Sequence, residues 1–128
     1  MAAQNILTQE QKEMLEAAGF KVEEAMKRFM NNEQLWIKFL KKFKSDLSYG
    51  ELVKAMEEKD DAKAFEAAHT LKGITGNLAM SGFNAIVSEQ TEYLRGEDKN
   101  FEAAAAMMPQ ITEIYENTIK TIDEVCGT

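Results

Sequence analysis

Apolar residues recur every three or four positions along most of this chain, and this spacing restricts its fold more than any other feature. The stretch from Phe101 to Val125 shows it best, with apolar members at Ala104, Ala105, Met108, Ile111, Tyr115, Ile119, Ile122 and Val125. Such spacing matches the 3.6-residue turn of an amphipathic α-helix. No segment alternates polar and apolar residues as a half-buried β-strand does. The sequence therefore predicts an all-α protein.

Capping residues and helix breakers divide the chain into several helices. Thr8 and Ser48 each match a capping box, because Gln or Glu follows three residues later. The other expected boundaries are an end at Gly19, starts at Asn31 or Asn32 and at Asp60 or Asp61, an end near Ser81 and Gly82, an end at Gly96 and a start near Asp98. Pro109, the single proline, should kink the last stretch or begin a new helix there.

Helices joined by short turns predict an up-and-down antiparallel four-helix bundle with additional short N-terminal helices. A length of 128 residues fits a single domain, residues 1–128, whose bundle proper spans about 31–125. The helix after Asn32 should bury five side chains by their spacing. These are Leu35, Trp36, Phe39, Leu40 and Phe43.

The charge balance argues against two classes of partner. The chain carries 22 acidic and 15 basic residues, a formal net charge of −7, which repels nucleic-acid phosphates and anionic lipid surfaces. No run of 18 apolar residues and no signal-peptide pattern occurs, so we expect a cytoplasmic protein that binds neither nucleic acid nor membrane. The single cysteine, Cys126, has no partner in the chain for a disulfide.

The only histidine, His69, lies in the segment from Asp61 to Leu78. Placing the residues of this segment 100° apart around a helix separates two faces. One face, expected to be buried, carries Ala64, Ala67, Ala68, Leu71, Ile74, Thr75 and Leu78. The opposite face carries Ala62, Phe65, Glu66, His69, Lys72, Gly73 and Gly76. His69 is therefore predicted to face solvent.

The neighbours of His69 give this exposed histidine a chemical interpretation. Gly73 and Gly76 each cost about 1 kcal/mol inside a helix relative to alanine, and clearing the approach of a partner to the imidazole would explain both. Lys72, three residues on, brings an ammonium group to the same face, where it can stabilise an anion on the ring. A neutral imidazole is a nitrogen nucleophile near neutral pH. Phe65, one turn before His69, is either part of a docking surface or a partly covered residue at the edge of the core.

The segment Ala68-His69-Thr70-Leu71-Lys72-Gly73, followed by Asn77-Leu78, closely resembles the signature of histidine-containing phosphotransfer (HPt) domains. The resemblance extends upstream through KVEEAMKRFMNNEQLWIKFLKKF and KAMEEKDDAKAFEAAH, and covers about Gly19 to Val125. It implies a four-helix bundle that exchanges a phosphoryl group between His69 and aspartates of response-regulator receiver domains, including that of a hybrid histidine kinase.

By resemblance, His69 matches the phosphoacceptor, Lys72 the phosphate-supporting lysine and Gly73 the small residue that admits the receiver. The family usually has glycine where this chain has Ala79, and its supporting polar residue on the next helix would fall at Thr91. The adjacent Gln90 belongs to the apolar stripe of that helix, so the resemblance assigns no supporting role to either residue. The remaining partner-binding candidates are Ala62, Phe65, Glu66, Gly76 and Arg95. The resemblance also implies that the reacting aspartate and its Mg²⁺ belong to the receiver, so we expect no cofactor or metal on this chain, and a monomer.

Two other readings of the same residues stay open. Glu66-x-x-His69 has the spacing by which helical bundles hold a di-metal centre, but such a centre needs a second Glu-x-x-His, and the chain has no second histidine. Alternatively, the outward face binds a partner as an adaptor or scaffold while His69 is chemically idle. A kinase acting alone is not expected, because the chain lacks the Gly-x-x-x-x-Gly-Lys loop that cradles nucleotide phosphates. The prediction is a phosphoryl carrier without an ATP site.

Overall fold

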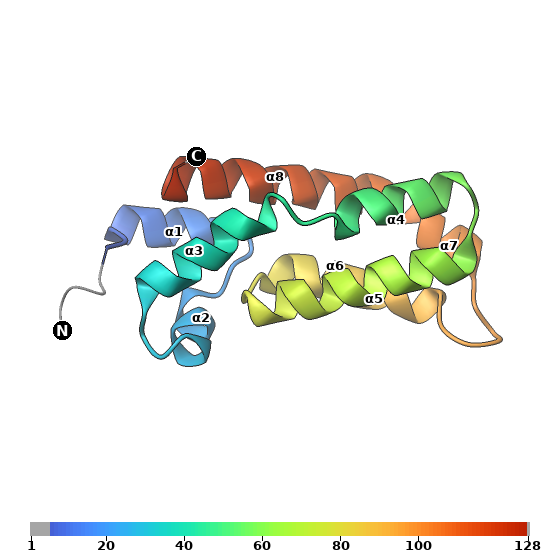
Figure 1. Cartoon of the computed structure of the whole chain (residues 1–128), viewed down its shortest axis with the longest axis horizontal. Coiled ribbons are helices and arrows are strands. Elements are labelled where there is room, and N and C mark those ends of the chain that lie inside the picture. Colours follow the sequence, from blue (N-terminus) through green and yellow to red (C-terminus); the bar gives the residue numbers. More distant parts are fainter. Residues whose placement is uncertain (1–5, 128) are drawn as a thin grey trace.

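The computed structural model describes residues 6–127, and every regular element within them is an α-helix (Figure 1). The helices are α1 (Gln9–Ala17), α2 (Val22–Arg28), α3 (Glu33–Phe43), α4 (Ser48–Glu57), α5 (Asp61–Asn77), α6 (Ser81–Tyr93), α7 (Phe101–Ala106) and α8 (Met108–Cys126). The predicted all-α class and the short N-terminal helices are confirmed. Among the described helices, none has both the length and the apolar character needed to cross a bilayer.

Most of the predicted helix boundaries are confirmed by capping contacts. The Thr8 hydroxyl accepts a hydrogen bond from the Gln11 amide at 3.0 Å, and the Gln11 side chain accepts one from the Thr8 amide at 2.8 Å. Asn32 and Asp60 cap α3 and α5 through their side chains. Gly19 follows α1 with φ +97°, and α8 begins at Met108 with Pro109 in its first turn.

Two predicted boundaries are wrong. Ser48 does not cap α4 but is its first residue, and its amide donates to the Asp46 carboxylate at 2.8 Å. Gly82 does not end the preceding helix but lies in the first turn of α6. Its amide donates to the Gly19 carbonyl at 2.9 Å, and a Cβ on Gly82 would lie 3.4 Å from the Gly19 Cα. The glycine at this position allows two backbone segments to approach closely.

The longer helices lie along a common long axis (Figure 1), and these are α1, α3, α4, α5, α6 and α8. α3 and α4 follow one another along it, α5 returns beside α4, and α6 runs antiparallel to α5. The short α7 turns the chain, and α8 runs back to pack against α3, α6 and α1. α5 therefore has α4 on one side and α6 on the other.

Each of the eight helices within residues 6–127 contributes at least one buried apolar side chain to a core cluster. Trp36 is fully buried and donates its indole N–H to the Leu78 carbonyl at 3.0 Å, which joins α3 to the end of α5. Leu35 and Phe39 were expected in this core but are 38% and 39% exposed. The buried stripe of α3 is narrower than the periodicity suggested, because only Trp36, Leu40 and Phe43 of the five expected residues are buried.

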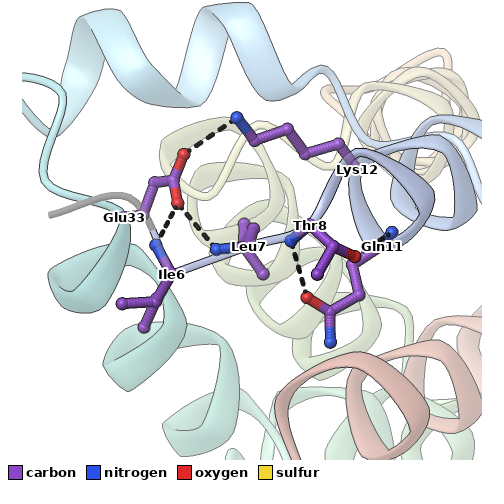
Figure 2. Close-up of polar contacts among 6 residues, drawn as sticks. All are labelled: Ile6, Leu7, Thr8, Gln11, Lys12 and Glu33. Carbon is purple, nitrogen blue, oxygen red and sulfur yellow. Dashed lines mark hydrogen bonds and ion pairs between the residues drawn. The ribbon is translucent and has the colours of Figure 1, made fainter. Parts of the chain in front are cut away.

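A buried carboxylate fastens the N-terminal segment to α3 (Figure 2). Glu33 is 2% exposed, accepts hydrogen bonds from the amides of Ile6 and Leu7 at 2.8 and 2.9 Å, and pairs with Lys12 at 3.0 Å. Burial acts to raise the pKa of Glu33, but the hydrogen bonds from Leu7, Lys12 and Ile6 outweigh it and hold that pKa below its ordinary value. The ionised carboxylate therefore belongs to the folded state.

Candidate functional site

α5 carries His69 on its exposed side, as the helical projection predicted. The side chains that share the opposite face and are buried are Ala64, Ala67, Ala68, Leu71, Thr75 and Leu78. Ile74, expected among them, is only half-buried. Asp60 begins the helix by accepting a hydrogen bond from the Lys63 amide at 3.1 Å, which sets the rotation of the first turn. The small residues of the buried face let α5 pack closely between α4 and α6, so His69 remains exposed.

An aromatic ring and a cation lie next to the imidazole. The Phe65 ring stacks on the His69 ring, with 5.6 Å between the centroids and 11° between the planes. The Arg95 guanidinium lies over the Phe65 ring at 5.3 Å from its centroid, and its Nε donates to the Glu92 carboxylate at 3.1 Å. Arg95 follows α6, so the site joins residues from two neighbouring elements. The structure thus brings together three residues, His69, Phe65 and Arg95, which the sequence placed on the candidate face separately.

Lys72 follows His69 by three residues and is half-buried. Within residues 6–127 it forms no ion pair with a carboxylate, so no acidic partner of the described chain neutralises its ammonium group. The Lys72 carbonyl accepts hydrogen bonds from the Asn84 side-chain amide at 2.8 Å and from the Thr75 hydroxyl at 3.1 Å. These contacts hold the turn of α5 that carries Lys72.

Sequence reasoning did not identify Asn84. Its side chain crosses from α6 to the Lys72 carbonyl and also donates to the Thr75 hydroxyl at 3.3 Å. One signal was available, since asparagine is an unfavourable residue within a helix unless its amide finds a partner. The partner itself could not be read from the sequence, because it lies on another helix.

The two glycines of α5 differ in their surroundings. A Cβ on Gly73 would meet nothing within 4 Å, so no contact inside the described protein explains this glycine. A Cβ on Gly76 would lie 3.2 Å from the Asn84 side-chain nitrogen. Gly76 therefore has a packing reason, which is the close approach of Asn84 to α5, whereas the clearance expected at Gly73 stays a prediction.

The other predicted partner-binding residues lie on different sides of His69. Ala62 is exposed in the first turn of α5. Glu66 is exposed and lines a hollow between α4 and α5 together with Lys54 and Lys63. Arg95 and Phe65 lie toward α6 instead. Phe65 is half-buried and packs against the core cluster, so part of the residue belongs to the edge of the core.

Thr91, at the position of the supporting polar residue, and the adjacent Gln90 are both fully buried. The Gln90 amide donates to the Ala104 carbonyl at 3.0 Å, and the Thr91 hydroxyl donates to the Val87 carbonyl at 2.7 Å. Both side chains therefore donate to backbone carbonyls in the protein interior, whereas the buried Gln90 Oε1 has no hydrogen-bond partner within residues 6–127.

Ala79, at the position where the resemblance predicted glycine, lies in the turn between α5 and α6. It has φ +59°, a conformation that glycine adopts without strain and alanine rarely does. Its carbonyl accepts a hydrogen bond from the Lys21 amide at 2.9 Å. The turn between α5 and α6 thus has the geometry that favours glycine, although the residue is alanine.

Within residues 6–127, no group of three or more histidine, cysteine, aspartate or glutamate side chains is arranged to hold a metal ion. Comparisons of the chain with family models, with curated proteins and with solved structures found no match.

Proposed function

We propose that this protein is a histidine phosphotransfer protein of a two-component phosphorelay. His69 accepts a phosphoryl group from the aspartate of one receiver domain and passes it to the aspartate of another. The observation that carries the proposal is the exposed imidazole on α5 with the unpaired Lys72 three residues away and the open space beside Gly73. The sequence resemblance to HPt domains over the same residues supports it.

The chemistry needs only a nucleophile and an anion-stabilising group from this chain. A ring nitrogen of neutral His69 attacks the phosphorus of the aspartyl phosphate, and an N–P bond forms as the O–P bond breaks. The receiver carboxylate leaves with the electron pair of that bond, and the proton on the other ring nitrogen passes to water. The Lys72 ammonium group offsets the charge on the phosphoryl oxygens. Transfer to the second receiver is the same step reversed.

The proposal extends to the architecture and setting of the protein. The segment α3–α4, helices α5 and α6, and the segment α7–α8 would form the up-and-down antiparallel four-helix bundle of the HPt class within one domain. The protein acts in the cytoplasm as a monomer and carries phosphoryl groups without hydrolysing ATP. The receiver supplies the aspartate and its Mg²⁺.

The docking face we propose surrounds His69. It comprises Ala62, Phe65, Glu66, Gly73, Gly76 and Arg95. Gly73 lies at its most open point, because a side chain there would project into space that nothing in the described protein fills. A receiver domain that contacts the docking face at this point would bring its aspartate to the imidazole.

The test is phosphoryl transfer from receiver domains. Receivers from the organism that encodes this chain are labelled on aspartate with radioactive acetyl phosphate, freed of the reagent and mixed with the protein. We expect label to move to the wild-type chain and to be stable in alkali but lost in acid, as a phosphoramidate linkage is.

His69→Gln is the matched control, because it keeps a polar side chain at an exposed helical position and removes the nucleophile. We expect it to take no label while its thermal unfolding is unchanged. Transfer to His69→Gln, or no transfer from any receiver to the wild-type chain, would show that the proposal is wrong. In the second case an adaptor function of the same face would replace it.

A further inference from the structure

The imidazole of His69 lacks the hydrogen bond that usually orients a reactive histidine. Such histidines commonly donate one ring N–H to a carboxylate or carbonyl, which fixes the ring plane and the tautomer. Within residues 6–127, no protein group forms a hydrogen bond with either ring nitrogen of His69, and the side chain is exposed. Something else must restrict the ring if it is to be presented to a partner in one orientation.

The stacked Phe65 ring is the contact that can do so. Its plane lies 11° from that of the imidazole, with the centroids 5.6 Å apart, which is the offset-stacked arrangement that aromatic pairs favour. Because the rings are offset, Phe65 shields only part of one face of the imidazole, and His69 as a whole stays exposed. Because the nucleophilic lone pair lies in the ring plane, the covered face does not obstruct attack by the ring edge.

Phe65 is itself held on two sides. Part of its ring packs against the buried cluster, and the Arg95 guanidinium lies over it at 5.3 Å. Arg95 is in turn bonded to Glu92 at 3.1 Å. The imidazole therefore stacks on a ring that contacts both the buried core and Arg95, the second residue after α6.

We propose that Phe65 is a positioning residue for His69, which fixes the plane of the imidazole and presents its edge for phosphoryl transfer. This inference rests on the proposed function. It differs from a docking role for Phe65, because it predicts an effect on the reaction of His69 with a donor too small to need docking.

The probe is phosphoramidate, H₂N–PO₃²⁻. A ring nitrogen of His69 forms an N–P bond as the N–P bond of the reagent breaks, and ammonia leaves after taking up the imidazole proton. Phe65→Leu removes the ring but keeps an apolar side chain, Phe65→Met does the same with a longer one, and Phe65→Tyr keeps the stack. We expect the two non-aromatic variants to react about two- to tenfold more slowly than wild type, and Phe65→Tyr to restore the rate.

A second readout follows the stack itself. The Phe65 ring current should displace the imidazole carbon-bound proton signals of His69 in the NMR spectrum, and Phe65→Leu should return them toward the positions of a free histidine. Phe39→Leu is the matched control, since Phe39 is also a partly exposed phenylalanine with a cation, Lys42, over its ring. It should change neither the reaction rate nor the His69 signals.

The outcomes separate the two proposals. Wild-type rates in both Phe65→Leu and Phe65→Met would overturn the positioning role while leaving phosphotransfer intact. Slower transfer from receivers alone, with an unchanged phosphoramidate rate, would make Phe65 a docking residue and also overturn it. A wild-type chain that takes label neither from phosphoramidate nor from receivers would overturn both proposals.

Discussion

Substituting alanine for Gly73 and for Gly76 should change the stability of the protein in different ways, although both glycines lie in α5. Alanine in place of glycine stabilises a helix interior by about 1 kcal/mol, and this gain is an upper bound at Gly76, which lies in the last turn of α5. At Gly73 the added Cβ meets nothing within 4 Å, so the full gain is expected. At Gly76 it lies 3.2 Å from the Asn84 side-chain nitrogen, tighter than ordinary van der Waals contact.

The cost at Gly76 follows from what Asn84 would lose by moving. Its side-chain amide donates to the Lys72 carbonyl at 2.8 Å and to the Thr75 hydroxyl at 3.3 Å, and it cannot retreat from the new methyl group without lengthening these bonds. A protein hydrogen bond contributes about 0.5–1.5 kcal/mol net. With one of these bonds weakened, the net effect of Gly76→Ala is at best about 0.5 kcal/mol of stabilisation and otherwise a destabilisation of about 0.5 kcal/mol or more, while Gly73→Ala is stabilised by about 1 kcal/mol.

Urea unfolding followed by far-ultraviolet circular dichroism measures both changes. A double-mutant cycle with Asn84→Ala removes the clash, so Gly76→Ala should recover its stabilising effect in that background. If Gly76→Ala were as stabilising as Gly73→Ala in the wild-type background, the packing reason for Gly76 would be refuted. Gly73→Ala should also slow transfer from receivers without slowing phosphoramidate, and equal receiver rates would refute the clearance role.

Three further changes test other contacts. With a labelled receiver as donor, Lys72→Ala should slow phosphotransfer about tenfold without abolishing it, and Lys72→Arg should retain most of the rate. An unchanged rate in Lys72→Ala would rule out the role of the ammonium group. Glu33→Gln should lower the free energy of unfolding by about 2 kcal/mol at pH 7. Because folding lowers the pKa of Glu33, the ionised carboxylate contributes its full stabilisation at pH values above its ordinary pKa of 4.5. This stabilisation is lost as the pH falls through the folded-state pKa, so the difference in unfolding free energy between Glu33→Gln and wild type should shrink there. A difference that stays constant with pH would contradict this. Trp36→Phe should destabilise the fold by about 2 kcal/mol in urea unfolding, since the Leu78 carbonyl loses its donor and the core loses volume.

Local signals in the sequence predicted most of the helices and the position of His69. Thr8, Asn32 and Asp60 cap helices through their own side chains, and such contacts depend on residues only three positions apart. The burial of Ala64, Ala68 and Leu71 opposite His69 follows from helical periodicity alone. These features need no knowledge of the neighbouring helices.

The predictions that failed did so for separate reasons. Ser48 matches a capping box, yet the Asp46 carboxylate accepts its amide and the helix begins at Ser48 itself. Gly82 looked like a helix breaker, yet it lies in the first turn of α6, where the glycine allows the backbone at Gly19 to approach closely. Leu35 and Phe39 have helical spacing but are partly exposed, since periodicity does not say how wide a face its neighbours cover.

The sequence alone determined that the chain is helical, where most of its helices begin, and that His69 and Lys72 share an exposed face, because these properties arise from residues within one or two turns of each other. Only the tertiary structure placed Arg95 over Phe65 and the Phe65 ring on His69, and only it showed that Gly76 makes room for Asn84 while Gly73 borders open space. These contacts join α5 to α6 or depend on what surrounds α5. Their geometry is set by how whole helices pack, which no local pattern of residues specifies.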